Sequence, residues 1–361
     1  MKAAGLDGVV AAETVLSMVD GEAGRLVIRG HELRDLVASG TTFEDVAALL
    51  WDGFAAEGGN PAVVRHGLGS ARSRAWALLP QLLPAAGTLG PVEVLRIGLG
   101  MLPDDDALPA HLRAVGALPV MTAALLRHAA GKAPVEPDPS LGTAADFLRM
   151  LRGVPASASE VAALDAYLVT VADHGMNAST FTARVIASTQ AGLVSAVLGG
   201  LCALKGPLHG GAPGPVLDML DDIGSEANIM PWLRSAIDRG QRLMGFGHRI
   251  YRVRDPRADV LKPVAARLAG GRNRIAFAEQ VEQAAIAVLA ERQPNRRLDT
   301  NVEFYTALVL EALQLPRAAF TAVFAIGRSA GWCAHVMEQE QTGRIIRPQS
   351  RYVGPLPAEA A

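Results

Sequence analysis

The sequence predicts a mainly helical protein with one short strand near its N-terminus. Apolar residues recur at spacings of three and four along most of the chain, and a typical run reads Val46, Leu49, Leu50 and Phe54. Only Gly24–Gly30 reads clearly as extended, because glycines bound a short run of strand-forming residues, and we expect it to be part of a hairpin. With 361 residues the chain exceeds the usual size of one core, so we expect a large domain with a smaller one, or two lobes facing a cleft.

The composition is that of a globular protein and weighs against a nucleic-acid binder. Half of the residues are hydrophobic and 19% are charged, which argues against disorder. The 34 basic and 36 acidic residues give a net charge of -2, whereas a nucleic-acid binder normally presents a basic face.

The N-terminal residues and the cysteines predict a protein of the reducing cytoplasm. Asp7 and Glu13 interrupt the apolar residues at the N-terminus, so no secretory signal is expected. The longest apolar run, Ala191–Leu204, is too short to cross a bilayer and predicts a buried helix. Cys202 and Cys333 lie far apart without a CxxC spacing, which disfavours a disulfide framework or a zinc site.

Segments rich in proline, glycine or aspartate predict the connections between helices. They are 57–61, 84–91 and 131–142. The acidic run Asp104–Asp106 predicts a solvated helix start rather than a carboxylate cluster for a metal, so we expect no metal site.

His209 lies in a segment that cannot be a regular helix, because glycines and prolines crowd around it in "KGPLHGGAPGP". A helix is predicted just beyond, at 215–220. A neutral imidazole beside a helix N-terminus can donate a hydrogen bond to a carbonyl oxygen that becomes negative. A plain turn with an incidental histidine explains this segment equally well.

His248 is flanked by Gly245 and Gly247 and followed by a cluster of cations. The cluster comprises Arg249, Arg252, Arg254, Arg257 and Lys262. Arginine forks bind carboxylates and phosphates through two hydrogen bonds, so the segment suits a small anion. A solvated helix face is the alternative, while a nucleic-acid patch is disfavoured because only Tyr251 offers a ring for stacking.

The remaining polar candidates for a functional site are His174 and two arginines. His174 lies in a polar island, "DHGMNAST", between apolar helices, and such an island needs internal partners or a polar ligand. A capped helix start at "NAST" explains part of it. Arg328 lies inside an apolar helical run and needs an anionic partner if buried, and Arg347 precedes a proline near the C-terminus.

Glu303 begins the apolar helical run "VEFYTALVLEALQLP" and has two interpretations. Thr300, three residues earlier, fits a capping box in which Thr300 and Glu303 satisfy each other's backbone donors. The alternative is a catalytic base.

Taken together, these segments resemble the citrate synthase family in its short bacterial form. The motifs that carry the resemblance, in the family's order, are "ADHGMNASTFTARVIAST", "ALKGPLHGGA", "GFGHRIYRVRDPRA", "NVEFYTALVLEAL" and "FAIGRSAGWCAHVMEQ". The similarity runs from about Gly5 to Gly354 and is weakest between Phe54 and Gly131.

The resemblance implies an all-α, two-domain fold with a short N-terminal β-hairpin, and a homodimer. It implies a large domain of residues 1–211 to which residues 315–361 return, and a small domain of residues 212–314 that closes over the substrates.

The resemblance also assigns roles to the candidate residues. His209 resembles the histidine that stabilises the enol of acetyl-CoA, His248 the one that polarises and protonates the oxaloacetate carbonyl, and Glu303 the catalytic base. His174, Arg257 and Arg328 resemble oxaloacetate-binding residues, and Arg347 the arginine donated across the dimer interface. For the CoA phosphates we expect Arg254 and Lys262; no metal or cofactor is expected beyond the coenzyme A thioester itself.

Two residues depart from the family pattern. Glu303 stands where the family usually has aspartate, which extends the base by one methylene, and Pro213 stands where asparagine usually follows "HGGA". The resemblance favours Glu303 as the base, and we expect condensation of acetyl-CoA with oxaloacetate to citrate. The alternatives are a 2-methylcitrate synthase that uses propionyl-CoA, since one methylene discriminates by only ~1–3 kcal/mol, and a catalytically weakened ligand-binding relative.

Overall fold

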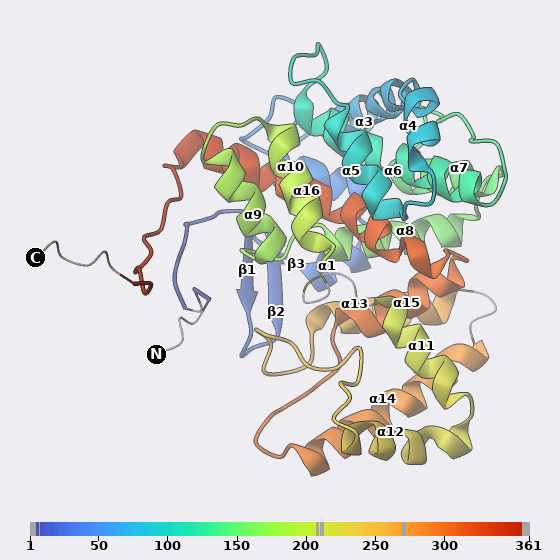
Figure 1. Cartoon of the computed structure of the whole chain (residues 1–361). Coiled ribbons are helices and arrows are strands. Elements are labelled where there is room, and N and C mark those ends of the chain that lie inside the picture. The colour runs from blue at the N-terminus through green and yellow to red at the C-terminus, as the bar shows by residue number, and fades with distance from the viewer. Residues whose placement is uncertain (1–4, 7, 207–208, 210–212, 269–271, 356–361) are drawn as a thin grey trace, which may run out of the picture.

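The protein is mainly helical, as predicted (Figure 1). A computed structural model describes all residues except 1–4, 7, 207–208, 210–212, 269–271 and 356–361. Within the described residues, no helix combines the length and the apolar run needed to cross a membrane.

A small antiparallel sheet lies near the N-terminus. Its strands are β1 (Ser17–Asp20), β2 (Arg25–Ile28) and β3 (His31–Glu32). β1 pairs with β2 so that Met18 faces Val27. The predicted hairpin is confirmed, and the chain then turns at Arg29 and Gly30, both with positive φ, so that β3 adds a third strand.

The helices of residues 33–204 form one body with a long C-terminal helix. They are α1 (Leu33–Ala38), α2 (Phe43–Trp51), α3 (Pro61–Trp76), α4 (Leu79–Ala86), α5 (Pro91–Gly100), α6 (Ala110–Ala129), α7 (Thr143–Arg152), α8 (Ala158–Val171), α9 (Ala178–Ala187) and α10 (Leu193–Leu204). The long helix is α16 (Phe320–Thr342), which packs against α2, α6, α8, α9 and α10 and is buried along most of its length. Residues of α16 are therefore held rigidly from several sides.

The remaining helices gather at the other end of the molecule (Figure 1). They are α11 (Pro213–Ile223), α12 (Ile229–Asp238), α13 (Pro256–Arg267), α14 (Arg272–Arg292) and α15 (Val302–Ala312), with short 3₁₀ helices at Glu226–Asn228 and Arg317–Ala319. α12 packs on α14, while α13 and α15 pack on each other and also touch α8. The five α-helices fall in the segment 212–314 that the sequence assigns to a small domain, and the two domain boundaries stay a prediction.

The helices that carry candidate residues begin at side-chain caps. Asn177 caps α9, Asp255 caps α13 and Asn301 caps α15, each by accepting hydrogen bonds from backbone N–H groups of the first turn. The capping box between Thr300 and Glu303, the alternative interpretation of Glu303, is absent, because Asn301 takes the cap position and the Thr300 hydroxyl instead donates to Glu282 at 2.7 Å. The Glu303 side chain is thus not used to cap its own helix.

Candidate active site

Two predicted histidines lie side by side although 74 positions separate them. The ring of His174, in the turn before α9, lies edge-on to that of His248 with ring centroids 5.5 Å apart. Nε2 of His174 is 3.1 Å from the Tyr251 hydroxyl. Burial first, and then the positive charge of Arg257, holds the pKa of His174 well below its usual value, so this imidazole is neutral.

Both ring nitrogens of His248 face hydrogen-bond donors. Its Nδ1 accepts hydrogen bonds from the backbone N–H groups of Ile250 at 3.1 Å and Tyr251 at 3.2 Å, and its Nε2 faces the guanidinium of Arg257. Burial, followed by the charge of Arg257, lowers the pKa of His248 to about 4. His248 is therefore a neutral imidazole at neutral pH.

Asp255 forms hydrogen bonds with both Arg257 in α13 and the start of α15. Its carboxylate accepts from Arg257 Nε at 3.0 Å and Nη2 at 2.8 Å, and from the backbone N–H of Val302 at 3.1 Å. Arg257 is buried, and its Nη2 is 3.2 Å from His248 Nε2. One carboxylate thus sets the anion-binding arginine relative to the helix that carries Glu303.

His209 is held by the first turn of α9. The backbone N–H of Ser179 donates to His209 Nε2 at 3.3 Å, and Ser179 Oγ is 2.8 Å from the same nitrogen. With Nε2 accepting, the proton of the neutral ring is on Nδ1. Burial and then the charges of Arg328 and Arg257 lower the pKa of His209 to about 4. Residues 207–208 and 210–212 lie outside the described part of the chain, as does the side chain of Pro213.

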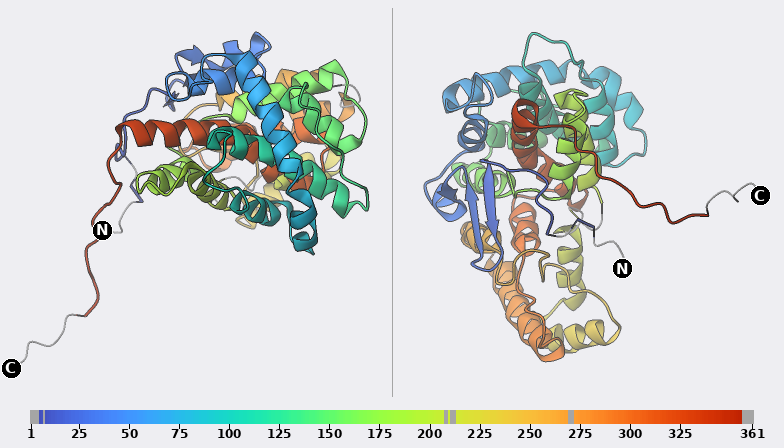
Figure 2. Two further views of the ribbon diagram at one scale, coloured as in Figure 1. Left: turned by 90° about the horizontal axis from the view of Figure 1, so that it is seen from above. Right: turned by 90° about the vertical axis from the view of Figure 1, so that its left-hand side faces the viewer.

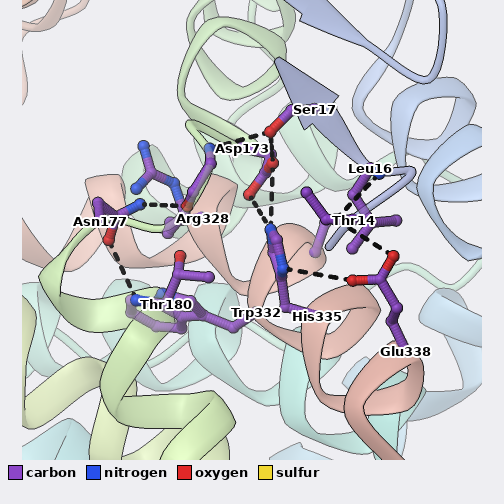
Figure 3. A network of polar contacts seen from close by, with 12 residues as sticks. Thr14, Leu16, Ser17, Asp173, Asn177, Thr180, Arg328, Trp332, His335 and Glu338 are labelled. Carbon is purple, nitrogen blue, oxygen red and sulfur yellow. Dashed lines mark hydrogen bonds and ion pairs between the residues drawn. The ribbon is translucent and has the colours of Figure 1, made fainter. Parts of the chain in front are cut away.

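Arg328 lies in α16 with an exposed fraction of 1%, which suits an arginine that binds an anion in the interior. Its Nε donates to the Val171 carbonyl at 2.6 Å, and burial lowers its pKa to about 10, so it remains charged at neutral pH. Figure 3 shows its side chain beside Asp173, Asn177 and Thr180. Thr180 Oγ1 is buried without a hydrogen-bond partner among the described residues, and an unpaired buried polar atom of this kind favours a polar ligand nearby.

Glu303 has the environment of a general base. It lies in the first turn of α15, where its backbone N–H donates to the Asn301 side chain at 3.0 Å. Burial raises the pKa of its carboxyl to about 7, although the nearby charges of Arg242 and Arg257 lower it. A base is most effective when its pKa is close to the working pH.

Three predicted residues lie apart from this group. Arg347 is exposed in the C-terminal segment, which leaves α16 and runs away from the body of the molecule (Figure 2). Arg254 forms ion pairs with Asp259 and Glu282, and Lys262 forms ion pairs with Glu279 and Glu282. The role of Arg254 and Lys262 in binding CoA phosphates stays a prediction.

Sequence reasoning missed four residues that shape the site. They are Ser179, Arg242, Tyr251 and Asp255. Asp255 and Tyr251 lie within the motif around His248, so their nearness was visible, but their contacts depend on how the loop folds. No group of three His, Cys, Asp or Glu side chains that could hold a metal ion occurs among the described residues.

Comparison with known proteins places this site in a family. The family pattern described as "Citrate synthase, C-terminal domain" matches residues 5–349. The chain belongs to the citrate synthase family.

Individual members of the citrate synthase family match along nearly their whole length. The citrate synthase of Haloferax volcanii is 36% identical to this chain, and the alignment covers 97% of this chain and 95% of the relative. A 2-methylcitrate synthase of Mycobacterium tuberculosis is also 36% identical, with 97% of this chain and 90% of the relative covered.

A solved structure carries the same fold. It is a ternary complex of carboxymethyl coenzyme A and oxaloacetate with citrate synthase from Thermoplasma acidophilum. The TM-score is 0.86 at 26% identity, covering 98% of this chain and 96% of the other. The predicted family and helical fold are therefore confirmed.

Proposed function

We propose that the protein condenses acetyl-CoA with oxaloacetate and water to give citrate and CoA. One observation carries this proposal: two neutral imidazoles, His209 and His248, whose pKa values are lowered to about 4, share a largely buried site with the Glu303 carboxyl, whose pKa is about 7. This combination suits removal of a weakly acidic proton and stabilisation of two carbonyl oxygens.

In the proposed mechanism each group has one task. Glu303 takes a proton from the methyl carbon of the thioester while His209 donates a hydrogen bond to the thioester oxygen, and the enolate forms. The enolate carbon then attacks the carbonyl carbon of oxaloacetate, whose oxygen receives a proton from His248, and the proton held by Glu303 is finally returned to His248. Water hydrolyses the resulting citryl-CoA, which releases citrate and CoA with its thiol.

The proposed oxaloacetate site uses the buried cations. Arg257 and Arg328 bind its carboxylates and His174 adds a polar contact, because a buried guanidinium pairs well with a carboxylate. We propose no cofactor or metal beyond the thioester substrate. Residues 212–314 are proposed to form a small domain that closes over the substrates bound to residues 1–211 and 315–361.

Oxaloacetate-dependent release of the CoA thiol tests the proposed reaction. Acetyl-CoA and propionyl-CoA are run in parallel with the purified protein, and we expect turnover of acetyl-CoA with the higher kcat/KM. A higher kcat/KM for propionyl-CoA would identify a 2-methylcitrate synthase, which the 36% identity to such an enzyme supports as the second candidate. If neither thioester is turned over although oxaloacetate raises the Tm by binding the folded protein, the chain is a ligand-binding relative.

We further propose a homodimer in which Arg347 completes the site of the partner subunit. The N- and C-terminal segments expose apolar side chains, among them Val9, Val10, Ile345 and Val353, which suits burial against a second copy. Cys202 and Cys333 are unpaired, which suits a cytoplasmic enzyme, and we propose a place in the tricarboxylic acid cycle.

Mixing two inactive variants tests the shared site. Arg347→Ala and His209→Ala subunits, mixed and allowed to exchange, are expected to recover about a quarter of the wild-type activity, because half of the dimers are mixed and each holds one intact site. Arg347→Ala alone is the control. Recovery of no activity, with exchange of subunits verified by mass, would place Arg347 outside the partner's site.

A further inference from the structure

Ser17 in β1 holds both residues that flank His174. Its hydroxyl donates to the carboxylate of Asp173 and accepts from the backbone N–H of Gly175 at 2.9 Å. Ser17 is more than 150 positions away in the sequence, so this is a tertiary contact. Gly175 has a left-handed φ of 57°, and the turn it makes aims His174 inward. One side chain thus fixes the turn through two hydrogen bonds.

Asp173 is in turn held from α16. Nε2 of His335 lies 3.3 Å from Asp173 Oδ2, and Arg184 Nη1 lies 3.1 Å from His335 Nδ1. Arginine only donates, so Nδ1 accepts and Nε2 carries the proton toward Asp173. Burial alone would raise the pKa of Asp173, but His335 and Arg328 lower it below its usual value, and the group is a carboxylate.

The close approach of α16 makes this arrangement rigid. A Cβ on Gly331 would lie 2.2 Å from the Ala172 carbonyl oxygen and 2.8 Å from Asp173 Oδ1, so only glycine allows the contact. Gly331 lies between Arg328 and His335 on the same helix. The distance between the turn that carries His174 and Arg328 therefore depends on the orientation of Asp173 and on the residues that fix this orientation.

A second anchor fixes the chain just before Ser17. Glu338 Oε1 accepts from the Thr14 hydroxyl at 3.2 Å (Figure 3) and from the backbone N–H of Val15 at 2.9 Å. Its other carboxylate oxygen pairs with Arg184. Leu16, between the anchors, is fully buried. Residues 14–17 are thus docked on the same buried network that reaches Asp173.

We propose that Ser17 is a positioning residue for the oxaloacetate site, and that docking of residues 14–17 sets the orientation of His174 relative to Arg328. This inference rests on the proposed function, because it assigns His174 and Arg328 to oxaloacetate. Ser17 does not touch the substrate; it acts through Asp173 and Gly175.

Ser17→Ala tests the inference, with Ser17→Thr as a rescue and Ser39→Ala as a matched control. Ser39 is a serine of the same region whose hydroxyl bonds only locally, to Leu36 and Thr41. We expect Ser17→Ala to raise the Kd and KM of oxaloacetate about tenfold, which corresponds to about 1.4 kcal/mol, while kcat and the KM of acyl-CoA change less than about twofold. Ser17→Thr keeps the hydroxyl and is expected to restore the Kd.

A purely structural role of Ser17 would give a different pattern. In that case Ser17→Ala would lower the Tm while leaving the Kd of oxaloacetate unchanged, or would alter the two substrates equally, and either result would overturn the inference.

Hydrogen exchange of residues 172–177 in the ligand-free protein separates this inference from the proposed function. Ser17→Ala is expected to speed exchange of the Gly175 amide, because it removes the hydroxyl that accepts from this amide. Ser39→Ala is expected to leave that exchange rate unchanged. If the wild type bound no oxaloacetate, the proposed function would fail, and faster exchange in Ser17→Ala would still support the positioning of this turn. Unchanged exchange would overturn the positioning role itself.

Discussion

Replacing Glu303 by glutamine is expected to lower kcat about 10³-fold, since positioned acid–base groups contribute on the order of 10² to 10⁴. Glutamine keeps the shape of the side chain but cannot take a proton from the thioester methyl. The Kd of oxaloacetate is expected to stay within about twofold of the wild type, because Arg257 and Arg328 are retained. Thiol release measures kcat, and calorimetry measures the Kd.

Two variants control for this result. Glu311→Gln removes a carboxylate from the same helix, one that pairs with Arg274, and is expected to leave kcat nearly unchanged. Glu303→Asp keeps the base but withdraws it by one methylene, and its kcat is expected to fall between those of wild type and glutamine, since a misplacement of about 1 Å can cost on the order of a hundredfold. Unaltered kcat in Glu303→Gln would mean that Glu303 is not the base.

The pH dependence follows from the same carboxyl. Glu303 must be ionised to act, so kcat/KM is expected to rise with pH through about 7 and then level off. For stability the sign is opposite: a folded-state pKa raised above the unfolded value means that the folded protein binds the proton more tightly, so this group's contribution is lost as pH rises through about 7. Glu303→Gln is therefore expected to have a higher Tm than wild type at pH 8. Glu311→Gln, which keeps Glu303, is expected to retain the wild-type pH dependence of kcat/KM and to show no such gain in Tm.

Replacing His209 by alanine is expected to lower kcat by about 10²- to 10³-fold, the usual effect of removing one donor from a developing oxyanion. In the proposed mechanism the neutral ring donates from Nδ1 to the thioester oxygen, because Nε2 already accepts from the backbone N–H of Ser179. The effect is expected in kcat rather than in the KM of oxaloacetate, since the donor acts on the other substrate. Steady-state kinetics with each substrate varied in turn gives this separation.

The controls for His209 use the geometry of its ring. His209→Asn places an amide donor near the position of Nδ1 and is expected to recover part of the lost kcat. His128→Ala removes an exposed histidine at the end of α6 and is expected to change nothing. A loss confined to the KM of oxaloacetate in His209→Ala would contradict the assigned role.

Most of the predicted site could be recognised from local sequence. His174, His209, His248, Arg257 and Glu303 each lie in a short motif whose polar residues interrupt apolar helices. The helical fold was predictable for the same reason, because apolar spacing is a property of neighbouring residues. The alternative interpretation of Glu303, a capping box with Thr300, does not hold, since Asn301 is also a good cap and the Thr300 hydroxyl donates to the distant Glu282.

The sequence by itself determined the family, the helical class and the identity of the candidate acid, base and anion-binding groups, because these follow from residue types and short spacings. Only the tertiary structure decided which nitrogen of His209 carries the proton, why the carboxyl of Glu303 has a pKa of about 7, and how Ser17 reaches the turn of His174. Tautomers, pKa shifts and long-range contacts such as that of Ser17 depend on burial and on partners far away along the chain. These partners come together only when the chain has folded.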